Sequence, residues 1–94
     1  MRRDSATARF THHARKRSAE RGVSSDAVQA ALWWGREVRV PTIIHHVLDR
    51  KSVAAARREG VDVDRYLGTI VIESARTGAI VTVYRTRSPK RIRR

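Results

Sequence analysis

A pair of β-branched segments joined by a short turn constrains this fold more than any other feature of the sequence. The segments span residues 66–74 and 79–87, and the residues between them end in Gly78. β-Branched side chains favour strands, and glycine supplies the positive φ of a tight turn. Alternation along the second segment puts Ile80, Thr82 and Tyr84 on one face and Val81, Val83 and Arg85 on the other. The sequence therefore predicts an antiparallel β-hairpin over residues 66–87.

Two helices are predicted ahead of this hairpin, and each is followed by a glycine. The first covers roughly residues 11–21 and ends at Gly22, a residue suited to a left-handed cap. The second begins after an N-cap at Ser24 or Ser25 and ends at Gly35. Its apolar residues fall at helical spacing: Val28, Ala31 and Leu32. Of the two adjacent tryptophans at its end, only one can face inward.

The segment between the helices and the hairpin is β-branched at first and helical in character afterwards. Residues 37–48 predict one strand, in which Pro41 indicates an edge position, a bulge or a break. Residues 49–59 predict a short helix or an ordered loop that ends at Gly60. The order of elements predicts a small α+β domain, with two N-terminal helices packed on one face of a small antiparallel sheet.

A chain of 94 residues is long enough for one modest core and too short for two. We expect a single domain over residues 9–87. Residues 1–8 are expected to form a flexible basic arm, and residues 88–94 a basic tail that adds electrostatic affinity for a polyanion.

The charge of the chain indicates a polyanionic partner. A net charge of +12 results from 21 Lys and Arg residues against 9 Asp and Glu residues, and lysine contributes only Lys16, Lys51 and Lys90. Arginine presents a planar fork that binds phosphate in a bidentate manner. Nucleic acid is therefore the leading partner class, and an anionic membrane surface is the weaker one.

Several classes of protein are excluded by what the sequence lacks. Without cysteine there is no disulfide, thiolate nucleophile or thiolate metal site. No apolar run approaches the length of a membrane span, and no apolar segment follows the N-terminal charges, as a signal peptide would require. No glycine-rich phosphate loop, nucleophile elbow or zinc spacing occurs. We expect a cytoplasmic protein without a cofactor and without a membrane partner.

One titratable residue and two arginines recur every fourth residue in the first predicted helix: His13, Arg17 and Arg21. Each step of four residues overshoots one helical turn by about 40°, so the three side chains share one stripe. His12 points about 100° away from His13, so the two imidazoles cannot serve one site equally. The stripe combines a proton-transfer group with two permanent cations, which suits a phosphate ligand.

Two segments of the chain resemble the domain of unknown function 4258 family. The first carries its opening signature in Phe10, Thr11, His13, Ala14, Arg17, Arg21, Gly22, Val23 and Ser24. The second, residues 78–85, resembles the hairpin turn and the Ile-Val-Thr-Val-Tyr strand of that family. This chain departs from shorter members by a longer middle, roughly residues 45–64. The family is similar to the RelE-like toxins of the barnase–colicin–RelE ribonuclease group, so the resemblance implies a RelE/barnase-like fold and metal-independent RNA cleavage.

The resemblance also implies roles for particular residues. Cleavage needs a base for the 2′-hydroxyl, an acid for the departing 5′-oxygen and cations for the phosphorane. His13 suits proton transfer because its ordinary pKa lies near neutrality. Arg17, Arg21 and Arg85 would hold the phosphate, and Tyr84 would assist. His46 lies outside the two similar segments; independently of the resemblance, it is a candidate second acid or base, paired with His13 across the sheet. The expected protein is the toxin of a toxin–antitoxin pair, whose acidic antitoxin the positive charge would attract.

Other interpretations of these residues remain open. Arg17 and Arg21 also suit solvated charges or ion-pair partners of Glu20 and Asp26. Adjacent His45 and His46 point to opposite faces of a strand, which argues against joint metal binding. Asp62 and Asp64 lack the glycine and the distal glutamate of a calcium loop and are expected in a turn. The same cationic face also suits a non-catalytic RNA- or DNA-binding module, or a protein that binds an acidic protein partner.

Overall fold

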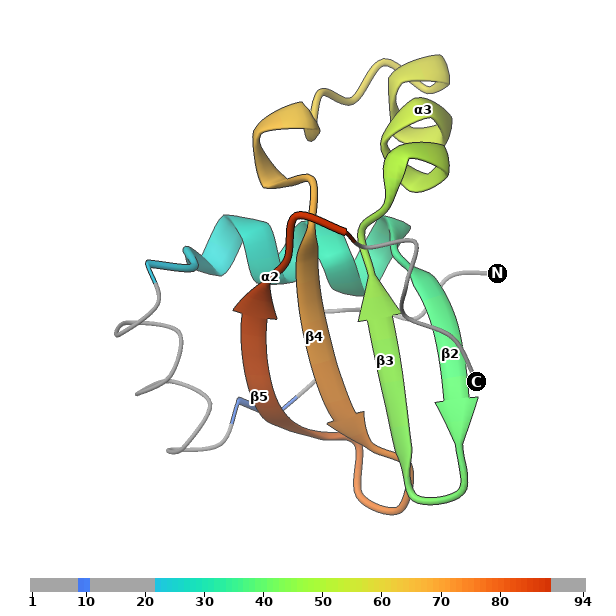
Figure 1. The fold of residues 1–94 in the computed structure, drawn as a ribbon, viewed down its shortest axis with the longest axis vertical. Helices are drawn as coiled ribbons and strands as arrows, with labels where there is room; N and C mark the ends of the chain where they lie inside the picture. Colours follow the sequence, from blue (N-terminus) through green and yellow to red (C-terminus); the bar gives the residue numbers. More distant parts are fainter. Residues whose placement is uncertain (1–8, 11–21, 89–94) are drawn as a thin grey trace.

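The computed structural model describes residues 9–10 and 22–88 and shows a compact α+β fold (Figure 1). Its elements are β1 (Arg9–Phe10), α2 (Ser25–Trp34), β2 (Arg36–Val40), β3 (Ile43–Val47), α3 (Arg50–Arg58), the 3₁₀ turn η2 (Asp64–Tyr66), β4 (Thr69–Ser74) and β5 (Ala79–Arg85). Strands β2 to β5 form an antiparallel sheet in the order β5-β4-β3-β2, and the short β1 pairs in parallel with β5. The predicted helix over residues 11–21 and the predicted arm at 1–8 lie outside the described residues.

Helix α2 forms where the sequence predicts it and covers one face of the sheet. The Ser24 hydroxyl accepts a hydrogen bond from the amide of Ala27 at 3.1 Å, which caps the N-terminus. At the other end Gly35 donates its amide to Ala31 O at 2.9 Å. Trp34 is buried, whereas Trp33 keeps 39% of its surface exposed, so the expectation that only one tryptophan faces inward is confirmed.

The single strand predicted over residues 37–48 is wrong, because the chain reverses at Pro41 and Thr42. Val40 and Ile43 are paired across this turn, and the segment forms two antiparallel strands, β2 and β3. Proline has a fixed φ that suits a tight turn, and it lacks the amide hydrogen that a continuous strand would use. The proline that indicated an edge, bulge or break thus stands in a hairpin turn.

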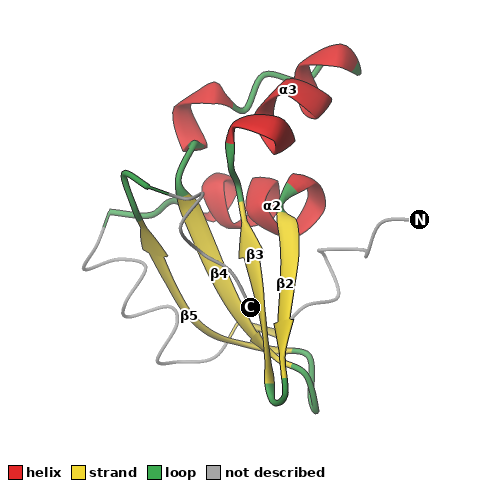
Figure 2. Cartoon of the chain, turned by 45° about the vertical axis from the view of Figure 1, so that its right-hand side comes forward, coloured by secondary structure: helices red, strands yellow, loops and turns green. Residues whose placement is uncertain are grey.

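A helical excursion separates β3 from β4 and lies beyond one end of the sheet (Figure 2). The region predicted as a helix or an ordered loop is helix α3, followed at Gly60 by a φ of 82°. Strand β4 starts at Thr69 rather than at residue 66, because Tyr66 belongs to η2 and Gly68 adopts a φ of 93°. Both hairpin turns lie at the opposite end of the sheet (Figure 1).

The hairpin of β4 and β5 is confirmed, but a bulge changes which side chains share a face. Ile72 pairs with Thr82 and the next residue, Glu73, pairs with Ile80, so Val81 is an extra residue on β5. As a result Ile80 is buried in the same core cluster as Val83, while Val81 is 39% exposed. The predicted grouping of Ile80 with Thr82 and Tyr84 is therefore wrong. Gly78 has the predicted positive φ, 74°.

The core has two parts, one on each face of the sheet. The larger part joins α2, α3 and the helix-facing side of the sheet through buried residues that include Ala31, Leu32, Leu48, Ala56, Val71 and Val83. The smaller part consists of Val38, Val47 and Ile70, with Ile72 and Tyr84 packed against them. None of the helices in the described part of the chain is long and apolar enough to cross a membrane.

Candidate nucleic-acid interface

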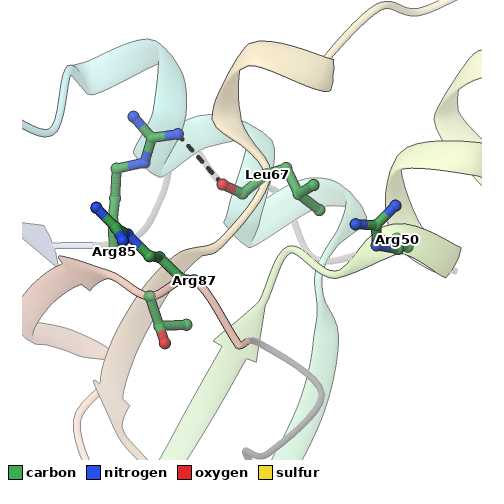
Figure 3. Close-up of a pocket in the computed structure, with 5 residues that line it drawn as sticks. Arg50, Leu67, Arg85 and Arg87 are labelled. Atoms are coloured by element: carbon green, nitrogen blue, oxygen red, sulfur yellow. Dashed lines mark hydrogen bonds between the residues drawn. The ribbon is translucent and has the colours of Figure 1, made fainter.

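An arginine-rich depression lies where β5 ends and α3 begins (Figure 3). Its volume is about 510 Å³, and it is lined by Arg50, Leu67, Arg85, Thr86 and Arg87. Arg85 and Arg87 lie on one side and Arg50 on the other, with Leu67 between them. We call these five residues the arginine seat.

Backbone hydrogen bonds at the base of the helical excursion bring the two sides of the seat together. Leu48 donates its amide to Thr69 O at 2.9 Å, and Gly68 donates its amide to Leu48 O at 2.8 Å. The amide of Thr86 donates to Gly68 O at 2.9 Å. These bonds hold the start of α3 beside the end of β5, although the two segments are far apart in sequence.

Asp49 fixes the first turn of α3 and therefore the position of Arg50. Its Oδ1 accepts from the Ser52 amide at 2.9 Å and from the Ser52 hydroxyl at 2.8 Å, and its Oδ2 accepts from Arg36 Nε at 2.8 Å. Burial, the largest single influence, acts to raise the pKa of Asp49, but the hydrogen bonds from Arg36 and Ser52 and the Arg36 charge lower that pKa below its ordinary value. The carboxylate stays ionised and ties β2 to α3.

Arg85 is held in place by backbone carbonyls rather than by a carboxylate. Its Nη2 donates to Arg65 O at 3.1 Å and to Leu67 O at 3.2 Å. A guanidinium carries five N–H groups, so these two bonds leave the N–H groups of Nε and Nη1 for a ligand. These described contacts position the side chain through neutral carbonyl groups, which do not neutralise its positive charge.

The ion pairs found among the described residues do not involve the arginines of the seat. They include Arg36 with Asp49, Arg39 with Glu37, Arg57 with Asp64 and the buried His46 with Glu73. Within residues 9–10 and 22–88, no carboxylate pairs with Arg50, Arg85 or Arg87, and all three residues are exposed. Three guanidinium groups that have no carboxylate partner in the described part of the chain produce a local positive potential around the depression, which attracts phosphate.

The structure separates the predicted site residues of the sheet. Arg85 lines the seat, whereas its neighbour Tyr84 packs against Val38, Val47 and Ile70 on the face away from α2. The structure does not bring Tyr84 and Arg85 to one place. The stripe of the first predicted helix, namely His13, Arg17 and Arg21, lies outside the described residues.

His46 is fully buried in the sheet rather than presented to a ligand. Its Nε2 lies 2.7 Å from Glu73 Oε1, and both side chains are almost completely excluded from solvent. His46 pairs directly with Val71, so it faces α2. Its Nδ1 is buried and has no hydrogen-bond partner. His46 is thus a buried residue of the sheet, whereas the arginines of the seat are exposed.

The two adjacent histidines of β3 do not form a metal site together. His45 and His46 are consecutive in β3 and point to opposite faces, as expected. No group of three or more His, Asp or Glu side chains that could hold a metal occurs within residues 9–10 and 22–88. Asp62 and Asp64 occupy a turn, in which the Asp62 carboxylate accepts from the Asp64 amide at 3.1 Å.

Sequence reasoning missed Arg50 and Arg87 as members of the site. Asp49 before a helical segment is a recognisable N-cap signal, and it could have placed Arg50 in the first turn of α3. No sequence signal indicates that this turn lies beside the end of β5. Comparison with models of protein families, with curated proteins and with solved structures finds no match for this chain.

Proposed function

We propose that this protein is a metal-independent endoribonuclease that holds RNA phosphates at the arginine seat. The observation that carries the proposal is the grouping of Arg50, Arg85 and Arg87 around one depression without a carboxylate partner among the described residues. The net charge of +12 gives long-range attraction for a polyanion of the same kind. RNA is the proposed substrate because it supplies the phosphates that suit this geometry and is the substrate that the family resemblance implies.

The proposed reaction is attack of a 2′-hydroxyl on the adjacent phosphorus. The O2′–P bond forms and the P–O5′ bond breaks, which yields a 2′,3′-cyclic phosphate and a 5′-hydroxyl. A base removes the 2′ proton and an acid protonates the departing O5′, which together contribute about 10² to 10⁴ in rate. Guanidinium groups stabilise the phosphorane. His13 is the proposed proton-transfer residue, with Arg17 and Arg21 beside it, on the strength of the sequence.

The positions of Tyr84 and His46 make them weaker candidates for direct chemistry. Tyr84 packs on the sheet face away from α2, and the ring of His46 is fully buried against Glu73. We assign both to support of the sheet that carries Arg85. The proposed catalytic set is therefore His13 with arginines, rather than His13 with His46.

The cleavage test uses purified protein, a mixed-sequence RNA and EDTA. We expect fragments that end in a 2′,3′-cyclic phosphate, loss of cleavage in His13→Ala, and a decrease in Arg85→Gln. Arg76→Gln is the matched charge control, because Arg76 lies in the β4–β5 turn at the opposite end of the sheet. Intact RNA, or equal cleavage by His13→Ala, would contradict the proposal.

A second candidate function is a non-catalytic RNA- or DNA-binding module. The observation that favours it is that neither histidine of the described residues lines the seat. This module would bind with a steep salt dependence, with a log–log slope near −5 for about six phosphate contacts to duplex DNA. It would leave RNA uncut, and His13→Ala would bind as the wild type does.

The proposed biological setting is a toxin that acts on cellular RNA in the cytoplasm and is neutralised by an acidic antitoxin. An excess of arginine over acidic residues supports such a partner through complementary charge. A small acidic protein that co-purifies with the chain and suppresses its cleavage of RNA would support this setting. Cleavage that no such protein suppresses would contradict it.

A further inference from the structure

We propose that the arginine seat recognises the phosphate group of a nucleotide and does not read its base. This property deepens the proposed function and rests on it, since it names what part of an RNA the seat takes. The ligand class is a sugar phosphate, supplied either by an internal phosphodiester or by a terminal phosphate.

The chemistry of the lining residues carries this proposal. Sites that read a base combine an aromatic ring, on which the base stacks, with hydrogen bonds from amide, carboxylate or guanidinium groups, whereas guanidinium groups without a stacking ring favour phosphate. The described residues that line the seat include no aromatic ring, no carboxylate and no side-chain amide. Two aromatic residues are neighbours of the seat in sequence. Tyr66 is partly buried against the larger core, and Tyr84 packs on the other face of the sheet. What remains beside the arginines is one apolar side chain, Leu67, and one hydroxyl, Thr86.

The arginines are placed as phosphate ligands from two directions. Arg85 is preset by its bonds to two carbonyl oxygens, and its Nε and Nη1 keep N–H donors for phosphate oxygens. Arg50 approaches from the first turn of α3, across the depression from Arg87 (Figure 3). The depression thus offers planar, charged forks for phosphate oxygens on both of its sides.

The size of the depression is consistent with a sugar phosphate rather than a bare ion. About 510 Å³ falls in the range of small-molecule sites. Leu67 provides an apolar surface between the arginines for the ribose, and the Thr86 amide is already engaged with Gly68. The seat thus binds the repeating unit of the backbone, which every nucleotide shares.

The test measures binding by the full chain of 2′-O-methylated oligouridylate and oligoadenylate of equal length, which the proposed nuclease cannot cleave. We expect Arg50→Gln and Arg87→Gln each to lower the affinity for both oligonucleotides by about tenfold, which corresponds to the loss of one charged hydrogen bond. Arg76→Gln should leave both affinities unchanged. Ribose 5-phosphate should displace the probes, whereas uridine should not. Circular dichroism checks that each variant is folded.

The possible results separate the seat from the proposed function. If Arg50→Gln and Arg87→Gln do not weaken oligonucleotide binding, the proposal that the arginine seat binds phosphate is overturned, whereas RNA binding by the protein is still supported. A loss of affinity for only one of the two oligonucleotides would overturn base-independent recognition. No oligonucleotide binding by the wild type would overturn the proposed function, and ribose 5-phosphate binding that depends on Arg50 would still support the seat. A 5′-phosphorylated probe that binds more tightly than its 5′-hydroxyl form identifies a terminal phosphate, and equal binding identifies the internal one.

Discussion

Replacing Glu73 by leucine should destabilise this protein more than any exposed substitution. The carboxylate is 1% exposed and its Oε1 lies 2.7 Å from the fully buried Nε2 of His46. A contact of this length needs a proton between the two atoms. Because His46 Nδ1 already has no partner, Glu73→Leu would leave both ring nitrogens buried and unsatisfied. Breaking a buried pair in this way costs about 3–5 kcal/mol.

That loss is large against the total stability of a small domain, about 5–15 kcal/mol. For a domain of this size, 1 kcal/mol shifts Tm by about 4–8 °C, so Glu73→Leu should lower Tm by roughly 12–40 °C. Urea and thermal unfolding, followed by far-UV circular dichroism and by tryptophan fluorescence, measure the loss of stability. Glu59→Leu is the control, because Glu59 is exposed at the end of α3 and its loss should cost no more than about 0.5 kcal/mol.

A double-mutant cycle decides whether the cost comes from the His46–Glu73 pair. His46→Leu should also destabilise, but the variant with both substitutions should lose less than the sum of the two single losses, since no unsatisfied histidine remains. We expect a coupling free energy of about 2 kcal/mol. Additive losses, or a Glu73→Leu variant as stable as the wild type, would refute the assignment of this pair to the stability of the sheet.

Two further predictions concern the helical excursion. Asp49→Asn should cost about 0.5–2 kcal/mol at neutral pH. The lowered pKa of Asp49 stabilises the fold above about pH 3.9, and this contribution is lost as the pH falls through the folded pKa. The free energy of unfolding, measured from pH 2 to 6, should therefore depend less on pH in the variant than in the wild type. An unchanged pH profile would refute the role of Asp49. Gly68→Ala should lower the free energy of unfolding, measured in urea, by clearly more than Gly60→Ala does. Both glycines have positive φ, but only at Gly68 would a Cβ overlap the Thr86 carbonyl oxygen. Equal losses in the two variants would count against that overlap.

Elements with local signals could be predicted from the sequence, whereas register could not. Ser24 and Gly35 mark the ends of α2 because capping depends on residues within a few positions. The bulge at Val81 has no local signal, since it results from the burial of Ile80 against residues from other elements. Pro41 indicates an interruption of the strand, but the reversal there depends on the pairing of β3 with both β2 and β4.

The candidate site divides in the same way. Arg85 could be predicted from its place at the end of an evident strand. Its separation from Tyr84 follows from strand alternation, which the sequence also contains. The approach of Arg50 could not be predicted, because it depends on backbone hydrogen bonds between segments far apart in the chain. The burial of His46 depends likewise on Glu73, which comes from another strand.

The salt dependence of RNA binding tests most directly the central claim that the arginine seat holds RNA phosphates. The measurement is fluorescence anisotropy of a 2′-O-methylated single strand in EDTA, with the wild type, the double variant Arg50→Gln/Arg87→Gln and the control Arg76→Gln. Each lost phosphate contact reduces the magnitude of the log–log slope by about 0.7. We predict a slope shallower by about 1.4 for the double variant and an unchanged slope for Arg76→Gln. Equal slopes for the wild type and the double variant would contradict the claim.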